Sequence, residues 1–85
     1  MSKIQTNENF LISLDRLKVG EAGSIDSYTS DSELNYRLRE LGLTKGTKIS
    51  VKRLAPFGDP MELRIRGYSL SIRKQDAAQI LIKKD

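Results

Sequence analysis

The segment RLAPFGDPMELRIRGYSLSIRK, residues 53–74, decides how this chain can fold. Over residues 62–73, apolar and polar side chains alternate with a period of two, which is typical of β-strands that bury one face. One face of the predicted pair of strands is apolar, and the other carries polar and charged side chains. Burying each apolar side chain stabilises the fold by about 1.5–3 kcal/mol. The apolar face consists of Leu63, Ile65, Leu70 and Ile72.

A glycine at the tip of this segment fixes the predicted turn. Gly67 followed by Tyr68 suits a two-residue type II′ turn, which needs a glycine at its first central position. In that register Arg66 pairs with Ser69, and the pairing continues residue by residue along both strands. Before the hairpin, APFGDP at residues 55–60 contains two prolines that cannot donate to a sheet ladder, so we expect a loop there.

The segment SDSELNYRLRELGL, residues 30–43, predicts the main α-helix, at about residues 31–41. Ser30 and Glu33 have the spacing of a capping box, in which each side chain satisfies a free backbone N–H group of the other residue. Gly42 is expected to end the helix in the left-handed conformation. Leucines recur at a helical spacing and form one apolar stripe, which consists of Leu34, Leu38 and Leu41.

The rest of the chain predicts short strands separated by turns. One strand is expected near residues 22–28, another follows a turn at Gly46, and a helical turn near residues 74–79 precedes a last short strand. The first apolar anchors are expected to be Leu14, Leu17 and Val19. This spacing of elements predicts a mainly β fold, a small and partly open β-barrel of about five short strands with one main helix.

The composition is that of one small globular domain. Of the 85 residues, 38% are hydrophobic and 31% are charged, which argues against a disordered chain. The absence of cysteine excludes a disulfide framework and suits a reducing compartment. Residues 1–9 are polar and aperiodic, so we expect a flexible tail there and a single domain over residues 10–85. Neither an apolar run of about 18 residues nor a signal peptide is present, so a cytoplasmic protein is expected.

Charge is distributed unevenly along the chain. Residues 1–31 contain three Lys or Arg against five Asp or Glu, whereas residues 32–85 contain twelve against six. The positive second part favours an anionic partner, either nucleic acid or an acidic protein surface. A nucleic-acid-binding barrel would combine a basic face with stacking rings, and here Tyr68 is the one ring expected near that face. The predicted basic face comprises Lys48, Lys52, Arg64, Arg66 and Arg73.

The residue types argue against catalysis and against transition-metal binding. The chain contains no histidine and no cysteine, the side chains that most often supply acid–base catalysis and soft metal ligands. Most carboxylates fall at predicted caps, turns or outward positions, and the glycines fit turns rather than a phosphate-binding loop. We therefore expect no catalytic residue, no cofactor and no metal site.

Most of the chain resembles the FeoA domain family, the small ferrous iron transport protein A. The resemblance extends from about Leu14 to Ile82 and is carried, in this order, by SLDRLKVGEAGSI, LRELGLTKGT, APFGDP, RIRGYSLSIRK and DAAQILI. It implies an SH3-like barrel and a cytoplasmic accessory of FeoB, the membrane ferrous iron transporter with a GTP-binding domain. The same domain type ends iron-dependent DtxR-like repressors, but without their winged-helix part this chain is not expected to be a repressor.

A protein-interaction module for FeoB is therefore the leading hypothesis, and binding of single-stranded nucleic acid is the alternative. The outer face of the helix and the proline-rich loop are the expected contact elements. Phe57 on a loop braced by prolines would lose little entropy on docking. Alternatively, its ring folds back and closes one end of the barrel. The predicted contact residues are Tyr36, Arg37, Arg39, Pro56, Phe57, Gly58 and Asp59.

Overall fold

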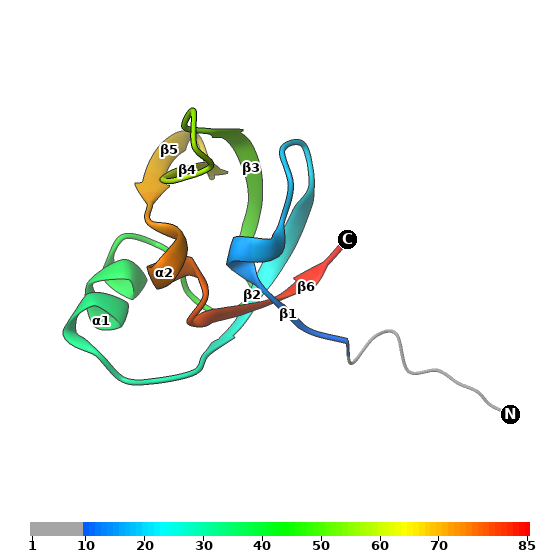
Figure 1. The fold of residues 1–85 in the computed structure, drawn as a ribbon. Coiled ribbons are helices and arrows are strands. Elements are labelled where there is room, and N and C mark those ends of the chain that lie inside the picture. Colours follow the sequence, from blue (N-terminus) through cyan, green and yellow to red (C-terminus); the bar gives the residue numbers. More distant parts are fainter. Residues whose placement is uncertain (1–9) are drawn as a thin grey trace, which may run out of the picture.

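Six antiparallel strands form one curved sheet in the order β1-β6-β2-β3-β4-β5. The computed structural model describes residues 10–85, and the expected N-terminal tail at residues 1–9 lies outside the described residues. The sheet curls around the core as a partly open barrel, and α1 lies beside one end of it (Figure 1). The strands are β1 (Ile12–Ser13), β2 (Ala22–Tyr28), β3 (Lys48–Leu54), β4 (Met61–Ile65), β5 (Tyr68–Ile72) and β6 (Ile80–Lys84). The α-helices are α1 (Glu33–Glu40) and α2 (Lys74–Ala77), and a 3-10 helix, η2 (Leu14–Arg16), follows β1.

Most of the predicted elements are confirmed. The fold is mainly β, with one main helix and one short helical turn at the expected places. The sequence did not predict β1, a two-residue strand that pairs with β6, so the sheet has six strands instead of about five. Leu14 and Leu17 are buried as expected, but Val19 is 56% exposed. A tight turn closed by the Glu21 N–H group and the Lys18 carbonyl carries Val19 out of the core.

The core is aliphatic and continuous. Every strand except β1 contributes buried side chains, and Ile12 of β1 packs against the core. The core is completed without either phenylalanine, since Phe10 is 67% exposed and Phe57 is 99% exposed. The buried apolar residues are Leu14, Leu17, Ile25, Leu38, Leu43, Ile49, Val51, Met61, Leu63, Ile65, Ile72, Ala77, Ile80 and Ile82.

The β4–β5 hairpin has the predicted faces but not the predicted register. Ile65 pairs with Tyr68, so its partner lies two positions away from the expected one. Gly67 has a φ of +77° and occupies the second position of the two-residue loop instead of the first. Because the difference is an even number of residues, every side chain stays on its predicted face. The observed register also adds a pair between Met61 and Ile72, whose side chains are both buried.

The N-terminus of α1 is capped by a different residue from the predicted one. The Oγ of Ser32 accepts a hydrogen bond from the backbone N–H of Asn35 at 3.0 Å, so Ser32 is the N-cap and the capping box of Ser30 and Glu33 is wrong. Glu33 is the first residue of the helix. The Ser30 hydroxyl instead donates to Oε1 of Gln79 at 2.8 Å, which draws it away from the helix end.

Gly42 ends α1 as predicted. Its φ is +112°, and its N–H donates to the carbonyl of Arg39 at 3.0 Å. The N–H of Leu43 donates to the carbonyl of Leu38 at 3.1 Å, which completes a Schellman motif. Leu43 is fully buried, so the chain passes directly from the helix end into the core. The turn at Gly46, with a φ of +88°, is also confirmed.

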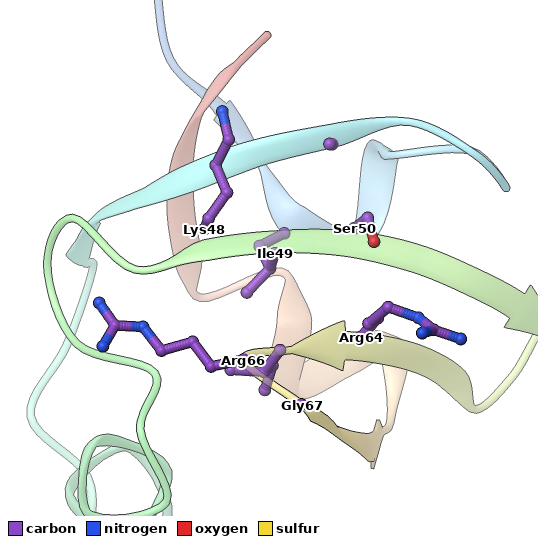
Figure 2. A pocket seen from close by; sticks show the side chains of 8 residues that line it. Lys48, Ile49, Ser50, Arg64, Arg66 and Gly67 are labelled. Atoms are coloured by element: carbon purple, nitrogen blue, oxygen red, sulfur yellow. The ribbon is translucent and has the colours of Figure 1, made fainter.

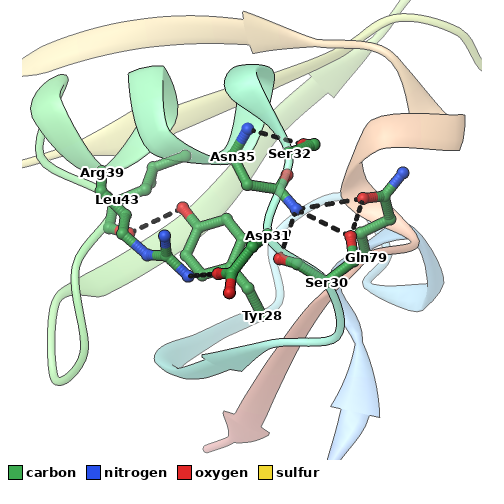
Figure 3. A network of polar contacts seen from close by, with 8 residues as sticks. All are labelled: Tyr28, Ser30, Asp31, Ser32, Asn35, Arg39, Leu43 and Gln79. Atoms are coloured by element: carbon green, nitrogen blue, oxygen red, sulfur yellow. Dashed lines mark hydrogen bonds and ion pairs between the residues drawn. The ribbon is translucent and has the colours of Figure 1, made fainter.

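The predicted leucine stripe of α1 is only partly buried. Leu38 is 5% exposed, but Leu34 and Leu41 are 37% and 45% exposed. The inner face of the helix carries Asn35 instead, and its Nδ2 donates to Oε1 of Gln79 at 3.0 Å (Figure 3). A buried amide without partners would cost about 1–3 kcal/mol. This hydrogen bond satisfies Nδ2 of Asn35, whereas its Oδ1 is buried without a partner among residues 10–85, and it ties the helix to the segment between α2 and β6.

β2 holds the two halves of the sheet together. It pairs with β3 on one side and with β6 on the other. At Gly23 a Cβ atom would lie 2.5 Å from the carbonyl oxygen of Lys83 and 3.1 Å from the Cα of Lys84. These distances are too short for packed atoms, so the close approach of β6 to β2 requires a glycine.

We expect Gly23→Ala to lower the free energy of unfolding by about 1–3 kcal/mol, because the new methyl group must push the β6 backbone away from β2. Ser24→Ala is the matched control at the next, partly exposed position and should stay within about 0.5 kcal/mol of wild type. Urea unfolding followed by circular dichroism measures both variants. A Gly23→Ala protein as stable as the Ser24→Ala protein would contradict this packing argument.

Candidate protein-interaction surfaces

The Phe57 loop, residues 55–60, presents an aromatic ring to solvent. The ring is 99% exposed, so the alternative in which it folds back to close the barrel does not occur. Within the loop, the N–H of Gly58 donates to the carbonyl of Ala55 at 2.7 Å, and the N–H of Ala55 donates to the carbonyl of Pro60 at 3.1 Å. These two bonds close the loop on itself, so Phe57 projects from a compact turn.

Asp59 is exposed, but its side chain is engaged in a hydrogen bond within the protein. Its Oδ1 accepts a hydrogen bond from the backbone N–H of Lys74, the first residue of α2, at 2.9 Å. The N–H groups of a first helical turn have no partner within the helix, and this carboxylate satisfies one of them. Asp59 therefore braces the Phe57 loop against α2, and Pro56 and Phe57 remain as its outward part.

The outer face of α1 presents Tyr36 and Arg37, whereas Arg39 is turned to an internal contact. Tyr36 is 63% exposed, and Arg37 is also exposed. The guanidinium carbon of Arg39 lies 4.2 Å from the centre of the Tyr28 ring, and its Nη2 lies 3.8 Å from Oδ1 of Asp31 (Figure 3). A cation over an aromatic face is attracted by the ring. Arg39 thus helps to hold α1 against the end of β2.

Tyr28 supports this contact from the sheet. Its hydroxyl donates to the carbonyl oxygen of Leu43 at 2.8 Å (Figure 3). Burial raises the pKa of the Tyr28 hydroxyl above its ordinary value of 10.0, and the positive charge of Arg39 lowers this pKa to a smaller extent. The hydroxyl therefore stays protonated at neutral pH and keeps its role as a donor.

The two predicted contact elements lie apart in the structure. Figure 1 places α1 and the Phe57 loop at different ends of the barrel, with α2 between them in this view. Asp59 connects the loop to α2, whereas Arg39 connects α1 to Tyr28 of β2. The two elements are therefore separate surfaces, each braced by its own internal contact.

A third surface is a hollow of about 360 Å³ on the outer face of the sheet, which the sequence did not predict (Figure 2). Three members of the predicted basic face line it, whereas Lys52 lies 3.6 Å from a carboxylate oxygen of Glu62. The small side chains of Ala22 and Ser50 were the available sequence signal, since they leave room between longer neighbours. The three basic residues are Lys48, Arg64 and Arg66.

In the part of the chain that the structure describes, no group of three or more His, Cys, Asp or Glu side chains is placed so that it could hold a metal ion. None of the helices in residues 10–85 is both long and apolar enough to cross a membrane.

We expect Arg39→Gln to raise the pKa of Tyr28 further, because it removes the positive charge that favours the tyrosinate. Arg37→Gln removes the same charge from the outer face of α1 and, as the matched control, should change this pKa less. An NMR pH titration of the Tyr28 ring resonances measures both variants. Because the unfolded chain loses this proton first, the stabilising contribution of Tyr28 is complete below pH of about 10 and falls above it. Equal pKa values in wild type and Arg39→Gln would refute the contact.

Comparison with known proteins places this geometry in a family. Residues 12–84 match the model of the FeoA domain. The solution structure of the FeoA protein from Chlorobium tepidum is 34% identical and superposes with a TM-score of 0.80 over 86% of this chain and 70% of that one. The zinc-complexed FeoA of Stenotrophomonas maltophilia, described as a prokaryotic SH3 domain protein, is 20% identical and superposes with a TM-score of 0.76 over 87% of this chain and 95% of that one.

A curated relative joins the same domain type to a transporter. The Fe(2+) transport protein A/Fe(2+) transporter FeoB fusion protein of Porphyromonas gingivalis is 33% identical over 70 residues, which are 82% of this chain and 8% of that protein. The present chain thus spans a small part of that relative's length. Because the family match covers nearly all described residues, this chain belongs to the FeoA domain family, which is associated with ferrous iron transport and has an SH3-like fold.

Proposed function

We propose that this protein is a non-enzymatic accessory of ferrous iron uptake that binds the cytoplasmic, GTP-binding part of a FeoB-type transporter. The observation that carries the proposal is the Porphyromonas gingivalis relative, in which a matching domain and FeoB share one polypeptide. Fusion keeps two domains at a high effective concentration, which favours partners that act together. Wherever the two domains are not fused, surface contacts must supply this association. The protein would then work in the cytoplasm, at the membrane face through its partner.

The Phe57 loop supports a docking role. A ring that is 99% exposed leaves apolar area in water that a partner can cover, and aromatic side chains are typical anchors of protein interfaces. The loop is closed by its own hydrogen bonds and braced on α2 by Asp59. Little conformational entropy is therefore lost when the loop docks. Phe57 is the proposed anchor, and Pro56 is its neighbour in the contact.

The outer face of α1 is the second proposed contact. Tyr36 and Arg37 are exposed there, and tyrosine and arginine are enriched among the residues that dominate binding energy. Arg39 and Asp59 act indirectly in this proposal, because their side chains hold α1 and the Phe57 loop in position.

A non-enzymatic role fits the residue types and their surroundings. The 85 residues include no histidine and no cysteine. General acid catalysis at neutral pH would then need a carboxyl group whose pKa is raised by its environment. Glu21 shows the opposite behaviour: hydrogen bonds from the Lys84 side chain and from the backbone N–H of Lys18 lower its pKa.

We expect Phe57→Ala to weaken binding to the cytoplasmic part of the transporter by about tenfold or more, because the truncation removes the proposed anchor. Biolayer interferometry with that part of FeoB from the same organism measures the dissociation constant, once with GDP and once with a non-hydrolysable GTP analogue. Val19→Ala is the matched control, since Val19 is an exposed apolar side chain outside the Phe57 loop.

Two results would contradict this proposal at different levels. If the Phe57→Ala protein is folded and binds as tightly as wild type, the Phe57 loop is not part of the interface. If the wild-type protein fails to bind at micromolar concentration with either nucleotide, the accessory role itself is wrong.

A further inference from the structure

The hollow on the outer face of the sheet combines positive charge with small side chains, and the core residues Ile49 and Ile65 also line it. It lies across β2, β3 and β4 next to the β4–β5 turn, and Figure 2 shows Arg64 of β4 and Arg66 of that turn pointing in opposite directions beside it. Its volume of about 360 Å³ is in the range of ligand-binding clefts. We call this hollow the basic groove, and the lining residues that matter below are Ala22, Lys48, Ser50, Arg64 and Arg66.

The strand register explains why a hollow exists at this place. Ala22 pairs with Ser50, and Ser50 pairs with Arg64, so the three residues form one row across β2, β3 and β4. Their side chains face outward because the adjacent residues Ile49 and Ile65 are buried in the core. The small side chains of Ala22 and Ser50 leave space above the sheet, and the longer side chain of Arg64 borders this space.

The positive charges of the basic groove are only partly neutralised. Nζ of Lys48 lies 2.6 Å and 2.7 Å from the two carboxylate oxygens of Asp85. Arg64 and Arg66 are exposed, and within residues 10–85 neither has an acidic side chain at ion-pair distance. One carboxylate is therefore already bound at the rim, and two guanidinium groups are open to further anions.

We propose that the basic groove binds an extended acidic segment of a partner protein. Carboxylates of the segment bind Arg64 and Arg66, whose planar guanidinium groups can each donate two parallel hydrogen bonds to one carboxylate. Small aliphatic side chains of the segment pack in the space above Ala22 and Ser50. The pair of Lys48 and Asp85 is an intramolecular example of the same contact.

An acidic protein segment fits the basic groove better than a nucleic acid does. Proteins that bind single strands stack bases on aromatic rings, and in the described part of the chain no residue lining the groove is aromatic. Tyr68 lies in an adjoining hollow, where its hydroxyl donates to the backbone carbonyl of Leu41. Glu40 lines the same adjoining hollow, so a phosphate chain that continued past Arg66 would meet a negative charge.

The basic groove is distinct from the surfaces assigned above to transporter binding. It lies at the start of β3, at Lys48 and Ser50, whereas the Phe57 loop follows the other end of that strand after Leu54. The class of ligand proposed for the groove is inferred from its lining residues alone, and not from binding to the transporter. The two proposals can therefore succeed or fail separately.

A fluorescein-labelled peptide of alternating Glu and Val residues is the probe, and fluorescence anisotropy measures its dissociation constant. Binding to the wild-type protein is expected at low salt and should weaken as salt is raised, because ions screen the charge attraction. The double variant Arg64→Gln/Arg66→Gln is expected to bind about tenfold more weakly or worse. The control Arg16→Gln/Arg73→Gln removes two exposed charges outside the groove and is expected to stay within about twofold of wild type.

Two further measurements protect this test against loss of fold and against unspecific charge effects. Circular dichroism verifies that each variant is folded, and the peptide is expected to shift the wild-type NMR amide signals of Ser50, Arg64 and Gly67. No binding at low salt, or equal weakening in both double variants, would overturn the proposal. A Gln-Val peptide that binds as tightly as the Glu-Val peptide would overturn it too.

A single-stranded oligothymidine in the same assay tests the other class of ligand. If it binds more tightly than the acidic peptide and depends on Arg64 and Arg66, the groove is a nucleic-acid site and the proposal is wrong. The assay contains no transporter, so a failure here is distinguishable from a failure of the proposed transporter binding.

Discussion

The close approach of β6 to β2 at Gly23 is the contact on which the rest of the structure depends. β2 joins the β3–β4–β5 part of the sheet to β6 and β1. Ile25 of β2 pairs with Ile82 of β6, so the same approach brings two core side chains together. Farther along β2, the Tyr28 ring makes a cation–π contact with Arg39 of α1, and this contact positions the helix. Both the helix face and the basic groove therefore take their places from this one strand.

The fold could be predicted from the sequence as far as local patterns determine it. Alternation in β4 and β5 put each side chain on its correct face, because burial depends only on whether a position is odd or even. It could not distinguish registers that differ by two residues, because both put the same side chains on the same faces. The prediction of Ser30 as part of the helix cap failed because a distant residue is involved. The Ser30 hydroxyl donates a hydrogen bond to Gln79, which is 49 positions away in the sequence.

The candidate surfaces were predictable only where a side chain has no use inside the protein. The proline-rich loop marked Phe57 as a candidate contact but left open whether its ring folds back, and the structure shows it exposed beside a core that is complete without it. Arg39 and Asp59 belong to the same two elements, but their partners, Tyr28 and Lys74, come from other parts of the chain. The basic groove needs small residues from β2 and β3 beside Arg64 of β4 and Arg66 of the β4–β5 turn, and only the strand register brings them together.

If the outer surface of a rigid barrel does the binding, its aliphatic core stays unchanged when the partner docks. Amide hydrogen exchange of the protein, alone and with the cytoplasmic part of the transporter bound, tests this most directly. Slower exchange in the Phe57 loop and at Tyr36 and Arg37, with unchanged exchange at Val51 and Leu63, is the expected result. Unchanged exchange in the loop and in α1, together with altered protection at Val51 and Leu63, would contradict it.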